Sequence, residues 1–168
     1  MSLSLVAAAI RDRALADTGT GGLFNVGSPL VKSCTHEYAP ATDSATNLAD
    51  LLPYIVFTFP SWEEDPTFSS EMQRITCSFH VYTLRENGAV VGANIMDRIY
   101  GDAVTQANRT PTYGFHRHTL VLGSQVGLGN ATWYPSSMRR TSRNTAHERD
   151  VYHYIESYHI DLTRAYTP

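Results

Sequence analysis

The short apolar run Tyr54–Phe59, which directly follows Pro53, constrains the fold of this chain more than any other stretch. A proline just before such a run is typical of a loop that leads into a strand inside a sheet, where both faces of the strand are covered. We therefore expect a sheet-based core with this segment near its centre.

Two further segments alternate between apolar and polar residues, as expected for strands with one buried face and one face in water. The first is Gln73–Leu84 and the second is Val151–Thr163. The expected buried positions are Ile75, Cys77, Phe79 and Val81 in the first strand, and Tyr152, Tyr154, Tyr158, Ile160 and Leu162 in the second.

Two segments carry apolar residues at helical spacing. One is a helix expected from about Ser4 to Asp17, which the glycine-containing segment 18–22 ends. The other is expected from Asn87 to about Thr105. The apolar stripes are Leu3, Val6, Ile10 and Ala14 in the first helix, and Val91, Ile95, Met96, Ile99 and Ala103 in the second.

The remaining segments are assigned with weaker signals. We expect a short edge strand at 23–26, an irregular segment at 32–52 with a helical turn at 45–51, a loop at 60–66, a strand at 112–122 and a long loop or arm at 123–149. Together the elements predict an α+β fold in a single domain spanning 1–168. Its core is a single mainly antiparallel sheet of four to five strands, with two helices packed on one face.

The composition favours a subunit whose surface is covered by neighbours. Charged residues make up 17% of the 168 residues, below the usual ~25%. Lys32 is the only lysine, and arginine is the basic residue enriched at protein interfaces. Cys34 and Cys77 imply no disulfide framework, which fits a reducing cytoplasm, and no apolar run predicts a membrane span or a secretory signal.

The sequence carries no recognisable catalytic constellation. His116 and His118 would project from one face of the strand expected there and could begin a zinc site, but further ligands would have to come from elsewhere. A histidine pair on a solvent face is the commoner reading. The chain is therefore expected not to be an enzyme and to need no metal or cofactor.

The charges are segregated along the chain. Residues 33–73 contain seven acidic residues and no basic one, whereas residues 103–147 contain five arginines and no acidic one. This pattern fits two loop surfaces whose charges segregated by chance. It also fits an acidic patch on one subunit that meets an arginine patch on the next, the head-to-tail contact that closes a ring.

The order of these elements resembles the tail-terminator, or tail-completion, family of long-tailed bacteriophages. The resemblance covers most of residues 4–163 and departs from the family pattern at 32–52 and 123–149. It rests on the first helix and its glycine turn, Leu-Pro-Tyr-Ile-Val-Phe at 52–57, the alternating strand 74–82, the helix around 93–100 and the closing strand 150–162.

The resemblance implies a structural virion protein at the tail–neck junction, assembled in the host cytoplasm. It would form a six-membered ring that caps the tail tube, ends its polymerisation and joins the tail to the head. The implied partners are other copies of the chain, the tail tube protein and a neck or head-completion protein, with non-specific contact to DNA in the lumen and none to a membrane. The alternatives are a neck (connector) protein or a small metal-dependent hydrolase built around His116 and His118.

For the ring, we expect an acidic group to pair across the subunit boundary with an arginine group, with apolar residues beside the arginines as anchors. Contact between the arginines and DNA in the lumen is the other reading. The interface candidates are Glu63, Glu64 and Asp65, then Arg139, Arg140 and Arg143, with Trp133, Tyr134 and Met138 as anchors.

Overall fold

The structure is a computed structural model that describes residues 3–38, 50–66, 70–86, 88–101, 113–122, 132–147 and 150–165. Two helices and six strands form an α+β fold. The sequence predicts this fold class and the two helices, but only four to five strands. In chain order they are α1 (Leu3–Leu15), β1 (Ser33–His36), β2 (Tyr54–Pro66), β3 (Ser70–Leu84), α2 (Gly88–Tyr100), β4 (Thr132–Pro135), β5 (Arg139–His147) and β6 (Val151–Ala165).

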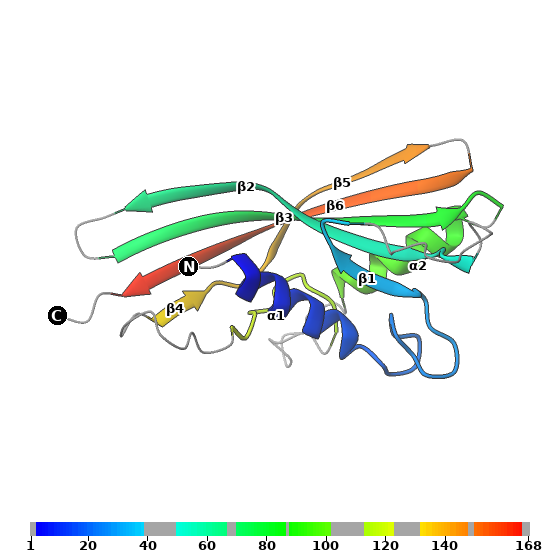
Figure 1. Ribbon diagram of the computed structural model, residues 1–168, viewed down its shortest axis with the longest axis horizontal. Helices are drawn as coiled ribbons and strands as arrows, with labels where there is room; N and C mark the ends of the chain where they lie inside the picture. The colour runs from blue at the N-terminus through cyan, green and yellow to red at the C-terminus, as the bar shows by residue number, and fades with distance from the viewer. Residues whose placement is uncertain are drawn as a thin grey trace.

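The strands form one strongly curled sheet in the order β1-β2-β3-β6-β4, and β5 also pairs with β6 (Figure 1). Because β4 pairs with the C-terminal end of β6 and β5 pairs with the rest, these two strands share the same edge of the sheet. The β1–β2 pair is parallel and the other pairs are antiparallel.

The two long strands β3 and β6 are the centre of this sheet, and their alternation is confirmed. They pair without interruption from Ser70–Ala165 to Leu84–Val151. The predicted inward side chains of β3 are all buried, and Tyr158 in the middle of β6 is fully buried as well. The opposite sides of both strands form a face of the sheet away from the helices, which we call the polar face.

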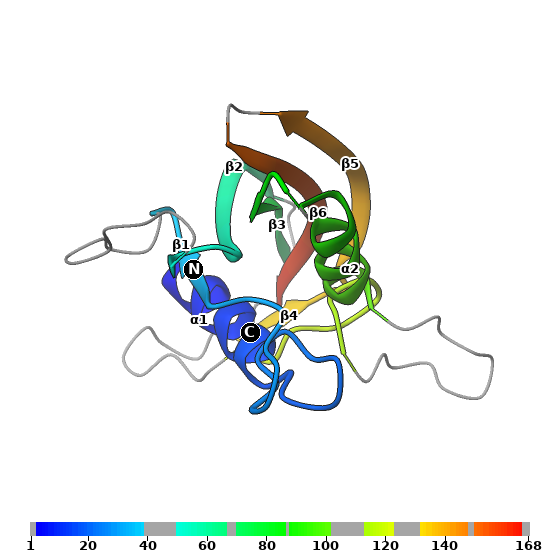
Figure 2. The same cartoon turned by 90° about the vertical axis from the view of Figure 1, so that its right-hand side faces the viewer.

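Both helices pack on the same face of the sheet, as predicted (Figure 2). Val6, Ile10 and Ala14 of α1 and Ile95, Met96 and Ile99 of α2 join one core with the inward side chains of β2, β3 and β6. An ion pair between Asp17 and Arg98, with Arg98 Nε 2.7 Å from Asp17 Oδ2, joins the end of α1 to α2. No helix in the described ranges is long and apolar enough to cross a membrane.

The N-terminal half differs from the expectation at three places. Residues 23–26 form turns and not an edge strand, and the short parallel strand β1 lies in the segment expected to be irregular. Residues 60–66 continue β2 and are not a loop. Prolines are tolerated at bulges and on edge strands, and Pro60 lies at a bulge between Thr58 and Ser61. The helical turn expected at 45–51 lies mostly outside the described residues.

The C-terminal half differs in two places. Residues 113–122 form bends with one isolated bridge, Thr119 to Ser137, and not a strand. Arg117 has a φ of 62°, which interrupts any extended conformation there. The arm expected at 123–149 is wrong for residues 132–135 and 139–147, which are strands of the sheet itself. Serines, threonines and arginines dominate β5, so its sequence lacks the apolar alternation that marks a strand.

Candidate subunit interface

The curled sheet ends in two edges whose strands have no further neighbour within the described ranges. On one side β1 covers β2 only at residues 54–57, which leaves the outer backbone of residues 59–66 unpaired by any other described strand. On the other side the outer backbone of β5 beyond Arg140 also faces no described strand. Unpaired strand edges are templates for pairing with another chain, so both edges are candidate contact surfaces.

The β2 edge carries two of the predicted acidic residues as exposed side chains. Glu63 lies opposite Arg74 on the polar face, and Arg74 in turn pairs with Asp161 at 2.7 Å. Glu64 points to the helix side, where its Oε1 accepts a hydrogen bond of 3.1 Å from Gln73. Asp65 belongs to the same strand, but its side chain lies outside the described part. The acidic group is therefore an exposed strand edge and not a loop.

The β5 edge divides the three predicted arginines between the two faces of the sheet. Arg139 is opposite His159 and lies with it on the polar face, where its side chain is exposed. Arg140 and Arg143 lie opposite Tyr158 and Glu156 and therefore face the helix side. Glu63 and Arg139 thus lie on the same face of the sheet at opposite edges.

Arg140 and Arg143 both bind a carboxylate within the subunit. Glu156 is fully buried, and its Oε1 accepts hydrogen bonds from Arg140 Nη1 at 3.0 Å and Arg143 Nε at 3.1 Å. Its Oε2 accepts a third bond, of 2.9 Å, from the hydroxyl of Tyr158. Burial and the neighbouring carboxylate both raise the pKa of Tyr158, so the phenol stays protonated and remains a donor.

The two arginines also connect this carboxylate to α2. Arg143 Nη1 lies 3.0 Å from Asp97 Oδ1, and the Arg140 guanidinium lies 4.1 Å from the centre of the Tyr100 ring. Tyr100 stacks in turn on His116, with ring centres 4.4 Å apart. The intersubunit pairing expected for Arg140 and Arg143 therefore competes with contacts that these side chains already make, whereas Arg139 stays an untested candidate.

The three predicted apolar anchors differ in the exposure of their side chains. Met138 is fully buried in the core of the subunit, so its side chain exposes no surface on which a neighbour could bind. Its backbone N–H donates to the carbonyl of His118, and its own carbonyl accepts a hydrogen bond from the backbone N–H of Arg117. These bonds hold the connection between β4 and β5 against residues 117–118. Tyr134 is exposed on β4 at 58% and remains a candidate, and the side chain of Trp133 lies outside the described part.

His116 and His118 do not lie on a strand, so the predicted geometry for two ligands on one face is wrong. His116 accepts a bond of 3.3 Å from the Arg140 backbone N–H through Nδ1, and burial, Arg117 and Arg140 lower its pKa. Burial and the charge of Arg13 lower the pKa of His118 to about 4. The described residues contain no group of three or more potential metal ligands.

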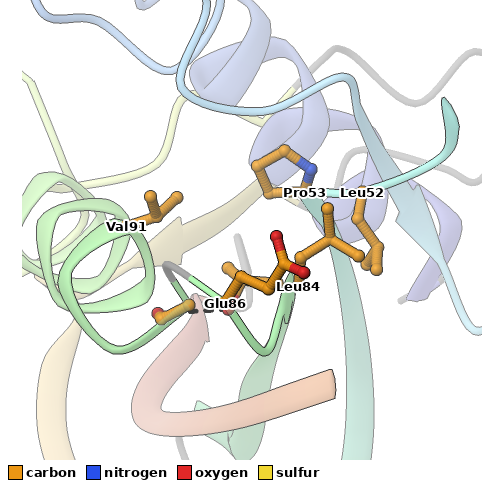
Figure 3. Close-up of a pocket in the computed structure, with 7 residues that line it drawn as sticks. Leu52, Pro53, Leu84, Glu86 and Val91 are labelled. Carbon is orange, nitrogen blue, oxygen red and sulfur yellow. Dashed lines mark hydrogen bonds between the residues drawn. The ribbon is translucent and has the colours of Figure 1, made fainter. Parts of the chain in front are cut away.

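A small apolar cavity of about 220 Å³ opens where β3 turns into α2 (Figure 3). Leu52 and Pro53 line one side, Leu84 and Val91 line the others, and the carboxylate of Glu86 lies among them. Its size suits one apolar side chain.

Sequence reasoning missed Glu156, the most buried charged group described. It occupies an inward position of β6, between Tyr154 and Tyr158, where the alternation otherwise places aromatic residues. A carboxylate at such a position requires partners, because an unpaired buried charge is very costly. This need for partners is the feature of the sequence that could have identified Glu156, and the arginines of the neighbouring strand meet it.

Comparison with protein-family models finds none that matches this chain, and comparison with curated proteins finds no match either.

Proposed function

We propose that this chain is a structural virion protein that forms a ring at the end of a bacteriophage tail tube, stops its polymerisation and joins the tail to the head. The proposal rests on the resemblance in the order of elements and on one structural observation. That observation is the presence of two sheet edges, one acidic and one carrying arginine, on opposite sides of the subunit, which no further strand of the described part of the chain covers.

Two different edges on opposite sides suit a head-to-tail contact. When one patch of a subunit binds a different patch of the next, the contacts generate a closed ring if the rotation closes. Strand-to-strand hydrogen bonds supply affinity in such a contact, and the side chains fix which edges pair.

The charges supply a register for this contact. Glu63 on the β2 edge and Arg139, which comes just before the unpaired part of β5, lie on the same polar face. They can therefore meet in one register when β2 of one subunit pairs beside β5 of the next. An exposed pair of this kind is worth only ~0–1 kcal/mol. Its role is therefore to select partner and orientation, and a ring repeats it at every boundary.

The experiment is a charge reversal with rescue. Glu63→Arg combined with Glu64→Arg should block ring formation, as measured by native mass spectrometry and negative-stain imaging on purified tail tubes. Arg139→Glu in the same chain should partly restore the rings. The matched control is Asp12→Arg, a reversal at an exposed position of α1, where the Asp12 side chain is 72% exposed.

Rings that form normally in the double reversal, or a rescue that fails while the single Arg139→Glu variant still assembles, would contradict this pairing. If Arg139→Glu instead loses only salt-sensitive retention of DNA, the arginine contacts DNA in the lumen. A ring that binds the head portal but not the tube would favour the neck-protein alternative.

A further inference from the structure

A pair of histidines bridges the two central strands on the polar face. His80 of β3 and His153 of β6 lie diagonally across the pair, with His80 Nδ1 3.0 Å from His153 Nε2. A hydrogen bond between these two ring nitrogens needs one protonated and one unprotonated atom. The contact therefore holds a proton in one defined place.

Thr58 on β2 is the partner of the other ring nitrogen of His80. His80 Nε2 lies 3.3 Å from the hydroxyl of Thr58, which can accept a hydrogen bond from a protonated Nε2 or donate one to an unprotonated Nε2. A neutral imidazole has one N–H, so in the tautomer with the proton on Nε2, His80 Nδ1 is the acceptor and His153 Nε2–H is the donor between the two rings.

Two tyrosine rings continue the stack from His153. The Tyr82 ring lies nearly parallel to His153, with centres 4.3 Å apart and an interplanar angle of 11°. Tyr54 stacks on Tyr82 at 4.9 Å. The face of an aromatic ring attracts a cation, so this stack would stabilise a charged His153, whose N–H would then be a stronger donor.

We propose that His80 and His153 form a proton-sharing clasp that joins β3 to β6 and opens when a second proton enters the pair. With His153 charged, the remaining acceptor in the contact is the Nδ1 lone pair of His80. A second proton from solvent binds that atom, and two N–H groups then face each other across 3.0 Å. The hydrogen bond is lost and the two like charges repel.

The residues directly opposite His80 on the two neighbouring strands carry no charge. The residues opposite it are Val56 on β2 and Ile155 on β6, both apolar. Burial and the charge of His153 accordingly lower the pKa of His80. The other described residues next to the pair on this face are uncharged near neutral pH: Tyr54 and Thr58 on β2, Ser78 and Tyr82 on β3, Ser157 on β6, and Asn144 and Ala146 on β5. The charged or titratable side chains on this face further along the described strands include Arg74, Asp161, His159 and Arg139.

Imidazole nitrogen NMR on the wild-type chain, from about pH 8 to about pH 5, tests the clasp directly. We expect His80 as the Nε2–H tautomer and two titration steps for the pair, separated by more than about one pH unit. The near-ultraviolet circular dichroism of the stacked tyrosines should change more at the second step, when the contact opens, than at the first. His80 as the Nδ1–H tautomer, or two histidines that titrate independently, would overturn the proposal.

Variants separate proton sharing from simple packing. His153→Asn should merge the two steps into one and move the pKa of His80 upward toward its ordinary value. Thr58→Val keeps the shape of the side chain but removes the acceptor, so the Nδ1–H tautomer of His80 should become detectable. His159→Asn, a change on the same face of the same strand, should leave both steps in place. If Thr58→Val leaves the tautomer unchanged, the assignment of the proton is wrong.

Discussion

Replacing Glu156 by alanine should destabilise the subunit more than any surface charge change, because three donors converge on this buried carboxylate. Removing one partner of a buried ion pair costs about 3–5 kcal/mol, since the remaining charges are left uncompensated. The side chains of Arg140 and Arg143 are 34% and 36% exposed, so water can partly solvate them after the change. The Tyr158 hydroxyl, in contrast, is left buried without its acceptor, which adds to the cost.

We therefore expect a loss of about 3–4 kcal/mol in the free energy of unfolding, measured by urea denaturation followed by circular dichroism. For a chain of this size, the melting temperature should fall by on the order of 10 °C. Asp97→Ala is the matched control, because it removes the other carboxylate that binds Arg143 but is 71% exposed. It should cost less than about 1 kcal/mol. If the two variants lower the free energy of unfolding equally, burial does not set the contribution of Glu156 to stability.

Three further outcomes follow from packing and protonation. Met138→Ala should cost about 2–5 kcal/mol by leaving a cavity in the core, whereas Tyr134→Ala should be nearly neutral in the same urea titration. Gly92→Ala should lower the melting temperature although alanine favours helices, because the added Cβ would lie 2.6 Å from Cδ2 of Tyr154. The pKa of His118 falls from 6.5 to about 4 on folding, so the unfolded chain binds more protons between these values. Stability should therefore be full above about pH 6.5 and decline toward about pH 4. His118→Asn should weaken this decline, and an unchanged pH profile in that variant would contradict the assignment.

The sequence predicted burial best where apolar residues recur at the fixed spacing of a strand or a helix. The alternation around Cys77 and Phe79 and the helical stripe through Ile95 and Ile99 predicted the face that each residue buries. This works because a strand or helix packed on one side repeats its environment at a fixed spacing.

The predictions failed where tertiary contacts decide the structure. The loop expected at 60–66 is a strand, in which Pro60 lies at a bulge where a missing N–H is tolerated. Strand β5 lacks an apolar alternation because its inward arginines pack against Glu156 instead of against an apolar core, so its sequence predicts an arm. The position of Glu63 on a strand edge depends on the pairing of β2 with β3, which the sequence alone does not reveal.

A cryo-EM reconstruction of the assembled particle at the tail–head junction would show the proposed ring directly. We expect six copies of this chain on the end of the tail tube, with the β2 edge of each subunit beside the β5 edge of the next. One or two copies at the junction, or a ring joined through other surfaces of the subunit, would contradict the proposal.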